Sequence, residues 1–185
     1  MVMVLPVPRF TIDSLDEFPE DGTRYELLEG TLLVTPAPSF FHQFVATHLV
    51  ILLQNAVGGQ AHVVAVGAIQ QGDSTQLQPD ILVLPASYPL TTHWRDVHDW
   101  WLAVEVMSPS SRIYDREVKR AAYLALGVQE YWLVDPASRS IEVWKPGVEG
   151  SDIVTDVLTW SPTPLGREVV VMVQQIFESA SSSRV

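Results

Sequence analysis

The chain has 185 residues, of which 47% are hydrophobic, and this length and composition are typical of one globular domain with a buried core. It has no cysteine, which excludes disulfides and thiolate metal sites, so a metal ion would have oxygen or histidine ligands. Its 11 Lys and Arg residues stand against 22 Asp and Glu residues, a formal net charge of −11. Nucleic-acid-binding proteins usually carry a basic excess. If this chain binds nucleic acid, we expect weak, salt-sensitive binding, a local basic patch or a partner that supplies the contacts.

The N-terminal segment does not have the features of a signal peptide, because Met1 to Leu5 has no basic residue and the apolar stretch is broken by Pro6 and Pro8. No apolar run in the sequence is expected to be long enough to cross a bilayer. The expected location is therefore the cytoplasm. We expect one domain over residues 1–178, followed by a disordered tail over residues 179–185.

The first third of the chain is expected to form a helical turn, a β-hairpin and a long, largely buried helix. These elements span Ser14 to Phe18, Arg24 to Glu29 with Thr31 to Thr35, and His42 to Ala56. Gly30 marks the hairpin turn, and Ser39 is the predicted N-cap of the helix. Gly58 and Gly59 are expected to end that helix.

The rest of the chain alternates between apolar strands and short helical segments. Strands are predicted over Ala61 to Ile69, Gln78 to Leu84, Trp101 to Val106, Glu130 to Val134, Ser140 to Trp144 and beyond Ile153, with helices over Ile113 to Leu126 and Val173 to Phe177. Gly127 stands where a C-terminal helix cap is expected. This order predicts an α/β fold, in which a mixed β-sheet is flanked by helices.

Three charged residues conflict with the pattern around them. Asp80 begins the apolar run Ile81 to Leu84, and Glu105 lies inside the apolar strand Leu102 to Val106. Lys119 falls on the apolar stripe of its predicted helix, where solvent would not reach a lysine.

A divalent cation would explain the two acids together. A buried carboxylate without a partner is costly, and two close carboxylates repel each other until one takes up a proton. A cation with hard-oxygen preference removes both problems. If the two strands are neighbours, Asp80, Glu105 and Lys119 meet around one metal ion. Each acid alone is also explained as a strand-end or ion-paired residue, and Lys119 as a lysine that pairs with Asp115 at the surface.

Several short motifs occur together in this chain: Arg24 to Gly30, Pro36 to Pro38 with His42 and Gln43, Gln78 to Asp80, Val104 to Ser111, Asp115, Lys119, and Gly127 to Pro136. In combination they resemble the motifs of the Uma-type restriction endonuclease family, which belongs to the PD-(D/E)XK nuclease superfamily. The resemblance covers roughly Arg24 to Pro146.

The resemblance implies a restriction-endonuclease-like fold with an N-terminal hairpin, in which Asp80 and Glu105 bind Mg²⁺ or, alternatively, Mn²⁺. The superfamily places a lysine two residues after the second acid, where this chain has Met107. In the family the lysine lies on the following helix, which makes Lys119 the catalytic candidate. Glu29 and His42 are candidates for positioning water or the ligands, beside the plainer readings of a hairpin glutamate and a core histidine. The implied partners are nucleic acid, DNA foremost, and a second copy in a homodimer.

Two other functions are compatible with the same residues. One is a catalytically silent nuclease fold that serves as an interaction module, and the other is a metal-dependent hydrolase of a small phosphoester. The serines of Ser108 to Ser111 are read as helix caps rather than nucleophiles. The aromatic residues Tyr88, Trp94, Trp100 and Trp101 are read as core or interface packing in preference to base stacking.

Overall fold

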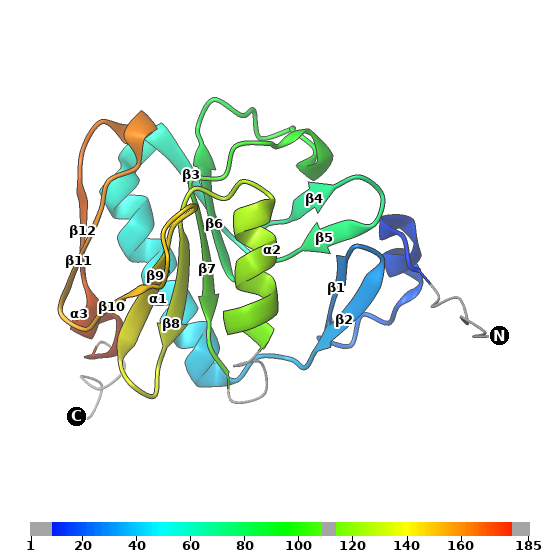
Figure 1. Cartoon of the computed structure of the whole chain (residues 1–185), viewed down its shortest axis with the longest axis horizontal. Coiled ribbons are helices and arrows are strands. Elements are labelled where there is room, and N and C mark those ends of the chain that lie inside the picture. Colours follow the sequence, from blue (N-terminus) through cyan, green and yellow to red (C-terminus); the bar gives the residue numbers. More distant parts are fainter. Residues whose placement is uncertain (1–8, 109–113, 179–185) are drawn as a thin grey trace.

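The computed structural model describes residues 9–108 and 114–178, and a six-stranded mixed sheet lies at its centre (Figure 1). The strand order is β10-β9-β8-β7-β6-β3. The strands are β3 Ala61–Ala65, β6 Ile81–Pro85, β7 Leu102–Val106, β8 Tyr131–Asp135, β9 Ser140–Trp144 and β10 Asp152–Val154. Only β7 and β8 pair in parallel within this sheet, so the predicted mixed sheet is confirmed. The tail predicted over residues 179–185 lies outside the described residues.

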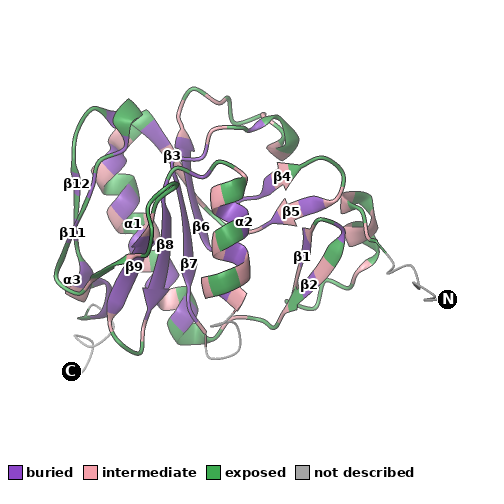
Figure 2. Cartoon of the chain, in the orientation of Figure 1, coloured by how far each residue is buried: buried purple, intermediate pink, exposed green. Residues whose placement is uncertain are grey.

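Alternation along the central strands divides the apolar core into two clusters, one on each face of the sheet. On β6, Ile81 and Val83 join one cluster, while Leu82 and Leu84 join the other. The first cluster is covered by α1 (Phe40–Val57), α3 (Val173–Glu178) and the two-stranded sheet β11 (Val157–Trp160) and β12 (Val169–Met172). The second is covered by α2 (Arg120–Ala125) and a smaller sheet. Both faces of the central strands are buried in consequence (Figure 2).

Helix α1 begins where the sequence predicts. The Ser39 hydroxyl accepts a hydrogen bond from the His42 N–H at 3.2 Å, which makes Ser39 the N-cap. Contrary to the sequence-based expectation, Phe40–Gln60 is long and apolar enough, by length and composition alone, to cross a membrane. A helix that packs on the core has the same properties, and α1 buries Val45, Leu49 and Leu53 against the sheet. The expectation that this helix is largely buried is wrong, because Phe40, Phe41 and Ile51 on its other side are exposed.

The smaller sheet holds the predicted N-terminal hairpin. Its order is β2-β1-β5-β4, with β1 Arg24–Leu28, β2 Thr31–Thr35, β4 Ile69–Gln71 and β5 Thr75–Leu77. The predicted strand from Ala61 to Ile69 is wrong in one respect, because it is divided into β3 and β4. Val66 has a φ of 53°, and its N–H donates to the carbonyl of Asp80, so the chain leaves the central sheet at this residue.

The segment between the parallel strands β7 and β8 is helical, as predicted, but it is not a uniform α-helix. Tyr114–Lys119 is a π-helical stretch that continues into α2. Helix α2 ends in a Schellman motif, since Val128 N–H donates to Tyr123 and Gly127 N–H to Leu124, and Gly127 has a φ of 98°. The serine caps predicted over Ser108 to Ser111 fall largely outside the described residues.

Candidate active site

Asp80 and Glu105 lie side by side because their strands are neighbours. β6 and β7 are antiparallel with Ile81 opposite Val104, so one step further along the register sets Asp80 opposite Glu105. Both side chains are buried, with 4% and 3% of their surface exposed. The two strands are therefore neighbours in the sheet, as a site shared by Asp80 and Glu105 requires.

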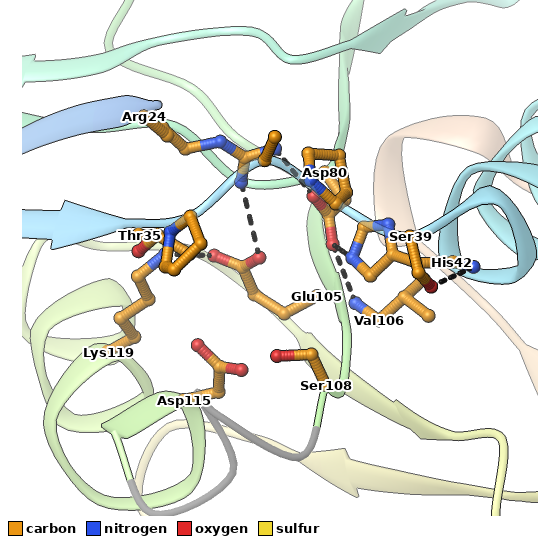
Figure 3. Close-up of a pocket in the computed structure, with 13 residues that line it drawn as sticks. Arg24, Thr35, Ser39, His42, Asp80, Glu105, Val106, Ser108, Asp115 and Lys119 are labelled. Atoms are coloured by element: carbon orange, nitrogen blue, oxygen red, sulfur yellow. Dashed lines mark hydrogen bonds and ion pairs between the residues drawn. The ribbon is translucent and has the colours of Figure 1, made fainter. Parts of the chain in front are cut away.

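The Asp80 carboxylate is bound by three donors from different elements. Arg24 Nη2 lies 2.8 Å from Oδ1, and His42 Nε2 and the Val106 N–H lie 2.9 Å and 2.8 Å from Oδ2 (Figure 3). Burial by itself raises the pKa of Asp80, but the hydrogen bond from His42 and the charge of Arg24 outweigh it and lower the pKa to about 2. Asp80 is thus an ionised carboxylate at neutral pH.

The Glu105 carboxylate has a less favourable environment. Its Oε1 accepts from Lys119 Nζ at 3.0 Å and from the Tyr123 hydroxyl at 2.7 Å, while Oε2 lies 3.9 Å from Arg24 Nη1. Burial raises the pKa of Glu105 to about 8; Lys119 opposes this shift and the charge of Asp80 adds to it. Two neighbouring acids with pKa values this far apart are typical of functional sites.

Lys119 is fixed between two glutamates rather than lying along the surface. Its Nζ is 2.7 Å from Glu26 Oε2 and 3.0 Å from Glu105 Oε1, and the side chain is 2% exposed. Glu26 is itself fully buried and accepts the Gln78 N–H at 2.7 Å. Burial lowers the pKa of Lys119, but Glu105 and Glu26 outweigh it, so the net shift is upward and the ammonium stays charged. The alternative of a surface pair with Asp115 is therefore wrong.

These groups open onto one pocket of about 190 Å³. Its lining joins the hairpin, the start of α1, the ends of β6 and β7, and the π-helical stretch (Figure 3). Typical pockets for drug-sized ligands are larger, at roughly 300–1,000 Å³, so this one suits a phosphodiester group and a cation better than a whole nucleoside.

The donor set fits a divalent cation that keeps several of its own ligands. Among the described residues no three Asp, Glu, His or Cys side chains converge as a complete metal cage. Asp80 and Glu105 supply two hard oxygen donors, and Mg²⁺ is commonly bound by one or two carboxylates together with water and substrate phosphate. Asp115 also lines the pocket, which adds to its negative charge.

Of the two further residues that the sequence singled out, one reaches the site and one does not. His42 contacts Asp80, as described above. Glu29 lies at the hairpin turn with a φ of 50° and an exposed side chain, and it is not among the lining residues. The glutamate that enters the site is Glu26, three residues earlier, because β1 turns that side chain towards Lys119.

Arg24, Glu26 and Tyr123 were not predicted from the sequence. Arg24 and Glu26 alternate with apolar neighbours on a hairpin strand, which is the usual pattern of a solvent-facing side. Tyr123 looks like an ordinary core residue of an amphipathic helix. The one signal in the sequence was the family resemblance, because its first matching stretch, Arg24 to Gly30, contains Arg24 and Glu26.

Met107 occupies the position where the superfamily has a lysine, and its side chain is only 5% exposed within the core. The aromatic residues read as packing are confirmed as such at Trp100 and Trp101, which are 5% and 3% exposed. Trp94 and Tyr88 are half-buried and pack against the cluster that contains Trp100 and Met107.

Comparison with known proteins supports this description of the fold. No protein with a curated description is similar enough to count as a match. A crystal structure of "a putative nuclease belonging to DUF820" from Anabaena variabilis ATCC 29413 superposes with a TM-score of 0.77 at 21% identity, covering 91% of this chain and 98% of that one. At this identity the likeness shows the fold. Residues 12–178 match the Uma2 family, described as "Putative restriction endonuclease", and the chain belongs to this family.

Proposed function

We propose that this chain is a divalent-metal-dependent endonuclease that hydrolyses phosphodiester bonds in nucleic acid. The observation that carries the proposal is the meeting of Asp80, Glu105 and Lys119 at one pocket from two adjacent strands and the next helix. Membership of the Uma2 family and the nuclease fold of the structural neighbour support it.

Asp80 and Glu105 would hold Mg²⁺ or Mn²⁺, with the backbone near Val106 as a further oxygen donor. When bound, such an ion activates a water molecule and neutralises charge on the phosphoryl oxygens. His42 orients Asp80 through the 2.9 Å contact, so that the carboxylate keeps one position. Tyr123 does the same for Glu105 through its hydroxyl.

Lys119 and Arg24 provide the positive charge of the pocket. An ammonium has three donors, so Lys119 can serve Glu26 and Glu105 and still donate to an oxygen that gains charge in the transition state. Arg24 reaches both carboxylates from the hairpin, and its planar fork suits a phosphate. Glu26 acts through Lys119 and is a positioning residue.

The proposal is tested with closed circular double-stranded and single-stranded DNA, because a circle without ends is cut only by an endonuclease. We expect nicking with Mg²⁺ or Mn²⁺, its loss in EDTA, and its return when the metal is restored. Asp80→Asn, Glu105→Gln and Lys119→Met should each lower the rate by about 100-fold or more.

The matched controls are charged residues that do not line the pocket. Glu117→Gln removes a 63% exposed acid from the π-helical stretch, and Lys145→Met removes a 49% exposed lysine. Both should keep wild-type rates. Hydrolysis of a small diester reporter without cleavage of any polynucleotide would favour the small-phosphoester hydrolase instead. If the folded wild-type protein cleaves no substrate with either metal, the proposal fails and the interaction module is favoured.

A further inference from the structure

We infer that the substrate is a nucleic-acid strand with unpaired bases. Two of its bases are held in separate pockets, one on each side of the phosphodiester site. This inference rests on the proposed function for the central pocket. It begins with two further pockets that adjoin that one and that the chemistry above does not use.

The first flanking pocket has a volume of about 280 Å³ and shares Ser39, His42 and Ser108 with the central pocket. The second has a volume of about 390 Å³ and shares Thr35 and Pro36 with it. The flanking pockets share no lining residue with each other, and they adjoin the central pocket at different parts of its lining, one at the end of β2 and one at the start of α1. A chain that passes its phosphate through the centre would have one neighbour on each side.

Each flank has an apolar wall that includes a phenyl or phenol ring, beside polar lining residues that include Asp135 in the first flank and Thr31 in the second. Phe41, which is 44% exposed, lines the first flank together with Met107 and Pro136. Tyr114, which is half-buried, lines the second together with Leu32. Flat rings on an apolar wall are the usual platform for nucleobases, and stacking works for every base because each has a π-face.

The charge of the molecule also favours contacts to bases. No Lys or Arg lines either flank among the described residues. Most Lys and Arg side chains of the described chain are engaged with carboxylates: Arg24, Arg116, Lys119, Arg120, Arg139 and Lys145. With a net charge of −11, phosphate contacts alone provide little affinity. Paired bases in a duplex are stacked on one another and are not available to either ring.

The inference is tested by fluorescence anisotropy with the full chain and Ca²⁺ in place of Mg²⁺, so that binding is measured without cleavage. The probes are a dT oligonucleotide, a rU oligonucleotide, an abasic strand of equal length and phosphate charge, and a duplex. We expect the dT strand to bind about tenfold more tightly than the abasic strand and the duplex. Binding of the rU strand as tight as that of the dT strand would extend the inference to single-stranded RNA.

Variants assign the difference to the two rings. Phe41→Ala and Tyr114→Ala should each remove most of the preference for dT over the abasic strand, whereas Phe41→Trp and Tyr114→Phe should keep it. Phe40→Ala is the matched control, since Phe40 precedes Phe41, is 86% exposed and lines none of the three pockets. Thermal unfolding verifies that every variant is folded.

The outcomes separate this inference from the proposed function. Equal affinity for the dT and abasic strands, preference for the duplex, or an equal loss in Phe40→Ala overturns the inference. If metal-dependent nicking persists in that case, the proposed function stands. If base-dependent binding is found but no polynucleotide is cleaved with Mg²⁺ or Mn²⁺, the flanking base sites stand and the nuclease proposal fails.

Discussion

Lys119 is the ion-pair partner of both buried glutamates of the site, Glu26 and Glu105. Two glutamates and one ammonium are almost completely removed from water, and each needs the others to offset its lost hydration. Breaking a buried ion pair by removing one partner costs far more than the pair contributes as a whole, because the remaining charge stays buried. Glu26 is therefore expected to matter for stability as well as for the position of Lys119.

We predict that Glu26→Gln lowers the free energy of unfolding by on the order of 3 kcal/mol. Glu29→Gln, on the same hairpin but exposed, should change it by no more than about 0.5 kcal/mol. Urea unfolding of both variants measures the difference. In the double variant Glu26→Gln/Lys119→Met, the loss should be smaller than the sum of the single losses. Equal effects at Glu26 and Glu29 would contradict the buried pair.

The stability of the metal-free protein should depend on pH through Glu105. Its pKa is 4.5 before folding and about 8 in the folded chain, so between these values the folded state keeps a proton that the unfolded state has lost. The resulting stabilisation is complete below pH 4.5 and disappears as the pH rises through about 8. For this one proton, the free energy of unfolding changes by at most about 1.4 kcal/mol per pH unit.

In EDTA, urea unfolding across this range should show stability falling as the pH rises, and Glu105→Gln should flatten the profile. Asp80 does not interfere, because its pKa is lowered from 3.8 to about 2. The stabilisation from Asp80 is present above pH 3.8 and is lost as the pH falls through about 2. An unchanged slope in Glu105→Gln would rule out the raised pKa.

At the scale of elements, the helix between β7 and β8 brings the lysine to the acids. β7 turns Glu105 towards α2, and two residues later Met107 is buried in the core, where a lysine would lose its hydration. The π-helical stretch Tyr114–Lys119 ends at the lysine itself. Helix α2 then ends at the Schellman motif, which returns the chain to β8.

Gly127 is predicted to be required for that return. An added Cβ would meet no atom within 4 Å, but the φ of 98° is strained for any residue with a side chain. Gly127→Ala should lower the free energy of unfolding by about 1–2 kcal/mol. Gly59→Ala is the matched control, because it also meets no atom and has no positive φ in the strained range. Thermal unfolding that shows equal effects would contradict the motif.

At the scale of the whole molecule, few Lys and Arg side chains of the described residues are left unpaired and able to bind the phosphates of a nucleic acid. The ion pairs named above engage most of the described Lys and Arg side chains, while Arg24 and Lys119 lie at the pocket. The homodimer that the family resemblance implies stays a prediction, which sedimentation of the full chain measures.

The affinity for single-stranded DNA should therefore depend weakly on salt. With two phosphate contacts, from Arg24 and Lys119, the slope of log K against log salt is expected to be about −1.4. Anisotropy titrations over a range of salt concentrations, with Ca²⁺ present, measure this slope. A slope several times steeper would reveal a basic contact surface that the described residues do not contain.

Local patterns were enough to predict most of the elements. The hairpin, the Ser39 cap of α1, the apolar strands and the Gly127 helix end each depend on neighbours in sequence, and the structure confirms them. The same holds for Asp80, Glu105 and Lys119, which were recognisable because a charge on an apolar strand or stripe is costly. The division of the strand at Val66 was missed, because the bond that supports it comes from Asp80, distant in sequence.

The sequence by itself determined that Asp80, Glu105 and Lys119 would be buried, since periodicity assigns a face to every residue of a strand or helix. Only the tertiary structure decided which charges meet. The register of β6 and β7 sets Asp80 opposite Glu105, and the position of the hairpin turns Arg24 and Glu26 from an apparent solvent face into the centre of the site. These pairings depend on distances across the fold, and no local pattern carries that information.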